Sequence, residues 1–201
     1  MRKATIALGL AALFVPLAAA QSKKIEATNL PDHPFQVEYP SGRKINLYLR
    51  SGDIRVIGKE EAKVTVRVNA EDLDKAREVK VRFEREDSSA DLSIWGGPRN
   101  NLQITVEVPK ATALFVRMSA GQLEISDVTG DKDAQLHFGE MIVHVGNPDD
   151  YSSVEASVNT GGIEAPPFGE DHGGLFRSFH KSGSGKYKLH AHVGAGDLNL
   201  R

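Results

Sequence analysis

The sequence predicts an all-β protein of stacked short strands, in a β-solenoid-like or rolled-sheet arrangement. Three observations support this: apolar residues alternate with polar ones along most of the chain, glycines recur just before short alternating pairs, and helical periodicity is nearly absent. A period of two places every second side chain on one face of a strand, so each run is expected to bury one face and expose the other.

The alternating runs follow one another from residue 45 to the C-terminal end. Their intervening positions carry Lys, Arg, Glu, Thr, Gln and His, which suit a solvated face. The only helical candidate, residues 70–78, is long enough for one or two turns. The expected strands are 45–49, 54–56, 64–68, 79–83, 92–94, 104–108, 114–118, 123–125, 136–138, 141–145, 154–158, 189–193 and 198–200.

The glycines define a repeated unit of the form small–Gly–polar–apolar–polar–apolar. Glycine supplies positive φ at a corner, so each unit is expected to be a tight turn that leads into a strand. The spacing is 18 residues from Gly121 to Gly139 and 22 from there to Gly161, which favours rungs that cover one another. An antiparallel β-sandwich with glycine turns is the alternative that the same pattern allows. The units are 51–56, 120–125, 139–143, 161–165 and 195–200.

The first residues predict export from the cytoplasm. A basic start, Met1-Arg2-Lys3, precedes an uncharged apolar run that closes on Ala18-Ala19-Ala20. This order is that of a secretory signal peptide, so residues 1–20 are expected to be removed and the product to lie in the periplasm or at the cell surface. Residues 21–34 are expected to be an N-terminal tether and residues 35–201 a single domain, with no membrane span in the mature chain.

Composition excludes several classes of protein. With 40% hydrophobic and 26% charged residues, the chain is neither disordered nor a membrane bundle. The formal net charge of −2 gives no electrostatic reason to expect nucleic acid as a partner. The sequence contains no cysteine, so an exported product must be stable by packing alone.

Three stretches resemble the exported bacterial adhesin-like β-strand-repeat domains of unknown function. They are 51–56, 108–125 and 194–200, and the resemblance covers roughly residues 35–201. It implies stacked short strands and a setting in the cell envelope or at the surface, and it supplies no catalytic residues. The chain departs from the family pattern in its irregular repeat spacing and in the long interruption between Ala165 and Lys186.

That interruption is the candidate partner-binding segment. Long ordered loops often carry binding function, and aromatic rings interleaved with cations can contact a sugar face or a protein. The same phenylalanines can instead cap an open end of the core. The residues concerned are Phe168, Phe176, Arg177, Phe179 and Lys181.

Other motifs favour structural roles. Asp53, Glu140 and Asp197 follow repeat glycines, where acids are ordinary turn residues rather than calcium ligands. His190 and His192 share one strand face without a third ligand, so no metal site is expected. No catalytic or cofactor motif appears. The sequence therefore favours a non-enzymatic envelope scaffold or adhesin-like module that meets an envelope protein or polysaccharide; a polysaccharide-binding or polysaccharide-active protein is the alternative.

Overall fold

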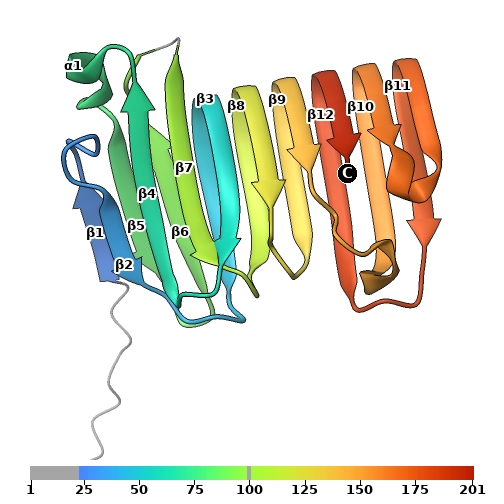
Figure 1. Cartoon of the computed structure of the whole chain (residues 1–201), viewed down its shortest axis with the longest axis horizontal. Coiled ribbons are helices and arrows are strands. Elements are labelled where there is room, and N and C mark those ends of the chain that lie inside the picture. Colours follow the sequence, from blue (N-terminus) through green and yellow to red (C-terminus); the bar gives the residue numbers. More distant parts are fainter. Residues whose placement is uncertain (1–22, 99–100) are drawn as a thin grey trace, which may run out of the picture.

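The computed structural model describes residues 23–98 and 101–201, which form one twelve-stranded sheet bent into two layers (Figure 1). The prediction of an all-β fold is confirmed. The strands are β1 (Lys23–Ala27), β2 (Phe35–Glu38), β3 (Lys44–Lys59), β4 (Lys63–Ala70), β5 (Lys80–Arg85), β6 (Ser89–Trp95), β7 (Leu102–Pro109), β8 (Ala113–Ser126), β9 (Lys132–Val143), β10 (Tyr151–Ala165), β11 (Glu170–Ser182) and β12 (Tyr187–Leu200). Three short helices accompany them: α1 (Leu73–Ala76), η1 (Pro148–Asp150) and η2 (Pro166–Phe168).

The central strands are long and bent, where the sequence predicted pairs of short strands. For example, β8 includes both 114–118 and 123–125, and its ladder with β9 continues on both sides of Gly121. In Figure 1 these strands rise in one layer, fold over at the top and descend in the other. The strand count was wrong because a glycine with positive φ turns the backbone without ending its pairing.

The glycines at these bends stand in register across the sheet. Each has a φ between +116° and +137°, and a Cβ at most of these positions would meet backbone atoms of the neighbouring strand. The glycine row therefore serves close stacking as well as turning. Its members, from one strand to the next, are Gly52, Gly121, Gly139, Gly196, Gly161 and Gly174.

The strand order departs from a simple sequential coil. Strands β3, β8, β9, β12 and β10 pair in parallel, and the C-terminal β12 lies between β9 and β10. At the other end β3 pairs with β6 through its first half and with β7 through its second. The two layers continue from there as antiparallel strands, β6–β5–β1 and β7–β4–β2. The antiparallel-sandwich alternative thus describes the N-terminal end of the molecule, and at the opposite end β11 alone is antiparallel to its neighbour β10.

The N-terminal segment is more ordered than expected. Residues 21–34 were predicted to be a tether, but Lys23–Ala27 form β1 on the edge of β5, and Leu30 is fully buried. This stretch is held by its backbone pairing with β5 and by apolar contact of Ile25, Ala27 and Leu30 with the core. The predicted helix is confirmed as α1, where Asp72 accepts a 3.1 Å hydrogen bond from the Lys75 amide. The expected signal peptide, residues 1–20, lies outside the described residues.

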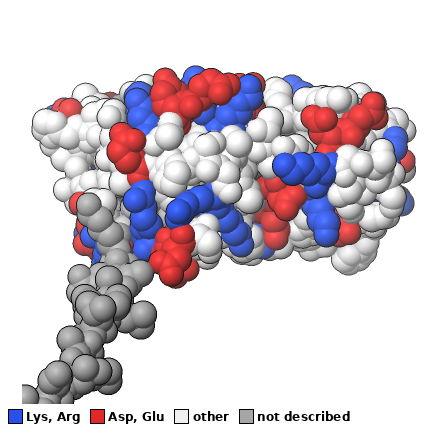
Figure 2. Space-filling view, turned by 90° about the horizontal axis from the view of Figure 1, so that it is seen from below, with Lys and Arg blue, Asp and Glu red and all other residues white. Residues whose placement is uncertain are grey.

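The hydrophobic core is one cluster that runs the length of the molecule between the two layers. Figure 2 shows acidic and basic side chains of both signs interspersed on one face of the molecule, as the small net charge implies. Within the described residues, no helix is long and apolar enough to cross a membrane.

Candidate functional site

Strand β11 ends the sheet at the right of Figure 1, opposite the N-terminal end. In the described part of the chain it pairs with β10 alone, and most of its side chains are exposed. We call residues Glu170–Ser182 the β11 edge. The sequence analysis treated this stretch as a loop because a strand exposed on both faces lacks apolar alternation. An unpaired strand edge offers backbone donors and acceptors to another chain.

Two adjacent apolar side chains project from the β11 edge at its bend. Leu175 is 62% exposed and Phe176 is 81% exposed. Phe176 has a φ of +51°, an uncommon conformation for an aromatic residue. Large apolar side chains that remain in water side by side are typical of a contact surface.

Two of the five predicted contact residues, Phe168 and Phe179, cap the core instead, and Lys181 is bonded to the first of them. Phe168 in η2 is buried, and its ring centroid lies 6.2 Å from that of the partly buried Phe179. The Lys181 ammonium donates a 3.2 Å hydrogen bond to the Phe168 carbonyl and lies 5.7 Å from its ring. Phe168 is therefore not available as a contact residue, whereas Phe176 and Arg177 are exposed.

The charges of the β11 edge are divided at the bend. Glu170 and Asp171 precede Gly174, and the cationic residues Arg177 and Lys181 follow it. The Arg177 Nε donates a 2.9 Å hydrogen bond to the carbonyl of Gly173, so this side chain folds back over the bend.

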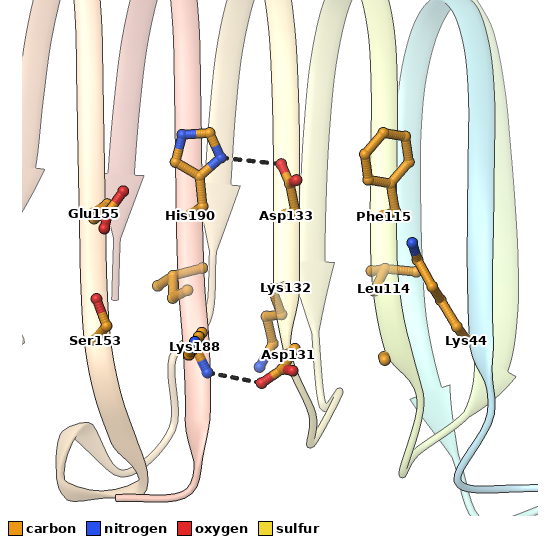
Figure 3. Close-up of a pocket in the computed structure, with 12 residues that line it drawn as sticks. Lys44, Leu114, Phe115, Asp131, Lys132, Asp133, Ser153, Glu155, Lys188 and His190 are labelled. Atoms are coloured by element: carbon orange, nitrogen blue, oxygen red, sulfur yellow. Dashed lines mark hydrogen bonds and ion pairs between the residues drawn. The ribbon is translucent and has the colours of Figure 1, made fainter. Parts of the chain in front are cut away.

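A shallow hollow lies on the outer surface of the first halves of β3, β8, β9, β12 and β10 (Figure 3). Its volume is about 420 Å³. On its wall Asp133 accepts hydrogen bonds from Arg117 at 3.1 Å and pairs with His190 Nδ1 at 3.0 Å. Burial raises the pKa of Asp133, but the hydrogen bonds from Arg117 and His190 outweigh it and hold the pKa below its usual value. This carboxyl is therefore unsuited to act as the general acid of a glycosidase.

The predicted histidine pair lies on this same surface. His190 contacts Asp133, and His192 Nδ1 lies 2.8 Å from the Ser157 hydroxyl. Burial, followed by the nearby charges of His190 and His137, lowers the pKa of His192. Among residues 23–98 and 101–201 no group of three or more His, Asp or Glu side chains could hold a metal ion.

The acids after the glycines do line up across the opposite layer. Gln122 stands between Asp53 and Glu140, which in turn is in register with Asp197. The Glu140 carboxylate accepts hydrogen bonds from Gln122 at 3.3 Å and from Asn199 at 3.1 Å. Both carboxylate oxygens of Glu140 are thus hydrogen-bonded to side chains of neighbouring strands, which agrees with a structural role.

Sequence analysis missed Lys132, the one lysine buried in the described residues, at 3% exposure. It occupies an apolar position of β9 between Leu114 and Leu189. Its ammonium donates to the Tyr151 hydroxyl at 2.9 Å and to the Gly130 carbonyl at 3.3 Å, and the Tyr151 hydroxyl donates to the Val145 carbonyl. Burial lowers the pKa of Lys132 to about 8 and raises that of Tyr151 to about 12. A lysine that follows an acid at a strand start gives no signal in the sequence that it will be buried.

The Lys132→Met variant is expected to be more stable than the parent near pH 7, by about 2 kcal/mol. In the parent, burial of the charged Lys132 ammonium costs about 3 kcal/mol of stability, which the variant regains. The variant also loses the hydrogen bonds of the ammonium, which removes about 1 kcal/mol of that gain. Between about pH 8 and 10.5 the unfolded chain keeps a proton that folded Lys132 has lost, so parent stability rises with pH in this window. Urea unfolding of both proteins near pH 7 and near pH 9.5 measures this; an equal difference at both pH values contradicts it.

No family model matches the chain, and no curated protein matches it. Two solved structures are similar to it. One, described as a "putative cell adhesion protein" from Clostridium sporogenes, is 13% identical with a TM-score of 0.49, and the match covers 90% of this chain and 99% of that one. The other, described as a "putative adhesin" from Bacteroides fragilis, is 12% identical with a TM-score of 0.31, over 89% of this chain and 97% of that one.

Proposed function

We propose that this protein is an exported, non-enzymatic, adhesin-like module of the cell envelope that engages a partner through its β11 edge. The observation that carries the proposal is the exposure of Leu175 and Phe176 on β11, the outermost strand of the core-packed sheet, which pairs with β10 alone among the described residues. Rigid aromatic anchors with a neighbouring arginine are the residues that dominate protein contacts. The N-terminal sequence supports export, and a mature protein that begins at Gln21 outside the cytoplasm is the expected product.

The polysaccharide alternative would use the hollow of Figure 3. Phe115 offers a ring there, but the Arg117 guanidinium already covers it at 3.5 Å from the centroid. Because its partners hold Asp133 ionised, this residue cannot be the general acid of a glycosidase, so the polysaccharide alternative for this hollow is sugar binding. Isothermal titration with envelope polysaccharides distinguishes the two surfaces, since binding in the hollow requires His190 and is indifferent to Phe176.

Replacing Phe176 and Arg177 together by alanine is expected to weaken capture of cells by the immobilised mature protein at least tenfold. Loss of an exposed aromatic anchor and its neighbouring arginine commonly costs about 2 kcal/mol of contact energy. Surface-plasmon or flow-cell counting of cells of the producing organism measures the effect.

The matched control is Phe138→Ala. Phe138 is 64% exposed but lies on β9, in the middle of the sheet. This variant should capture cells as the parent does, and the circular-dichroism spectra of all three proteins should agree. Unchanged capture by the double variant would remove the β11 edge as the contact site.

A further inference from the structure

The path of β11 is compatible with pairing to a second copy of itself under two-fold rotation. Strand β11 crosses from one layer of the sheet to the other at Gly174, as the other long strands do at their own glycines. A second β11 running antiparallel crosses in the opposite direction. Both layers would then continue into the second molecule with their bends aligned. Two β11 strands paired in parallel are not related by such a two-fold axis, so they would not form a closed dimer.

We infer that the partner at the β11 edge is a second copy of this chain, with the two β11 strands paired antiparallel about a two-fold axis at Gly174. The inference rests on the proposed function, because it names the occupant of the same edge. Gly174 facing Gly174 of the second copy extends the glycine row that already runs from Gly52 through Gly161.

Charge complementarity favours this register. With glycine opposite glycine, Asp171 stands opposite Arg177 of the second copy, and the symmetry forms this pair twice. Directly opposed unlike charges stabilise antiparallel strand pairs, and like charges destabilise them. A parallel arrangement in the same register would instead place Asp171 against Asp171 and Arg177 against Arg177.

The apolar side chains at the bend support the same arrangement. Leu175 and Phe176 follow Gly174 directly, so both copies bring them next to the axis, where their exposed surface becomes buried. Interfaces of this kind have an apolar centre and a charged rim.

The backbone at Gly174 can be approached closely by a second strand. A Cβ built on Gly174 would meet, as its nearest neighbours, the guanidinium atoms of Arg177 at 3.1 and 3.3 Å, and these belong to a flexible side chain. In the free molecule this guanidinium bonds the Gly173 carbonyl. Its transfer to the carboxylate of the second copy releases that carbonyl to pair with a backbone amide across the interface.

Sedimentation velocity of the mature protein over a concentration series tests the inference. We expect a monomer–dimer equilibrium. Asp171→Arg and Arg177→Asp should each weaken dimerisation at least tenfold, and the double variant that exchanges the charges should return to within about threefold of the parent. The control Lys59→Asp makes the same charge change as Arg177→Asp at an exposed position outside β11, and should leave the equilibrium unchanged.

Three outcomes overturn the inference. The first is a monomer at every concentration, and the second is a species larger than a dimer, as head-to-tail pairing of β11 with β1 or β2 would give. The third is an exchanged-charge variant that does not dimerise although its thermal unfolding matches that of the parent. Failure of the proposed function is separable. If cells lacking this chain are captured through Phe176 and Arg177, the edge has another partner, and only the inference fails. If the protein dimerises as described but the alanine double variant captures cells normally, only the proposed function fails.

Discussion

Gly139→Ala is expected to lower the free energy of unfolding by more than about 3 kcal/mol. Two costs add at this position. The φ of Gly139 is +128°, which an alanine rarely adopts. A Cβ would also collide with the backbone carbonyl of Gly121 on the neighbouring strand, and neither backbone can retreat without opening the ladder between β8 and β9. Urea unfolding followed by circular dichroism measures the loss.

Gly146→Ala is the matched control. Gly146 also has positive φ, +70°, but a Cβ there has open space within 4 Å. This variant should lose about 1 kcal/mol of unfolding free energy, which is the cost of placing alanine at a positive φ without any steric collision. If the two alanine variants unfold at the same urea concentration, the glycine row contributes only its backbone conformation and close stacking is not what requires it.

Phe168→Ala is expected to destabilise the protein by about 3 kcal/mol. Phe168 is buried at the β11 end of the core, where its ring lies against that of Phe179, so its removal leaves a cavity there. Phe176→Ala, which removes a ring of the same size from the same segment, should change stability by less than about 0.5 kcal/mol because that ring is in water.

Thermal and urea unfolding of the two phenylalanine variants separate capping from binding within one segment. The sequence left both roles open for residues 166–186; in the structure Phe168 is buried at the end of the core and Phe176 is exposed. Equal destabilisation by the two substitutions would mean that Phe176 also packs against the fold, and would remove it as a contact residue.

The two ends of the molecule are closed by different means. At the N-terminal end the layers continue into antiparallel strands, and β1 and β2 form the outer edges. At the β11 end, η2 places Phe168 at the end of the core, and within residues 23–98 and 101–201 no strand pairs with the outer side of β11. The exposed side chains of Leu175 and Phe176 therefore lie on a strand edge that can accept another strand.

Sequence reasoning was most successful where side chains alternate strictly. Ile45, Leu47 and Leu49 are buried as predicted, because a period of two allows only one face to enter the core. It failed for Leu30, which joins the core outside any alternating run, and for Lys132, a charged residue that is buried at an apolar position of β9. The sequence-based prediction also placed Phe168 and Phe176 in one site. Their spacing does not show that η2 buries the first ring while β11 leaves the second exposed.

Local alternation and the conformational range of glycine were enough to predict the all-β class, five of the six bends and the stretch that holds the exposed Phe176. The fold in three dimensions was needed to show that β12 inserts between β9 and β10, that six glycines form one row, and that β11 is the outermost strand. Strand order depends on which apolar faces and backbone edges match across long separations, and that matching has no signature within any single segment.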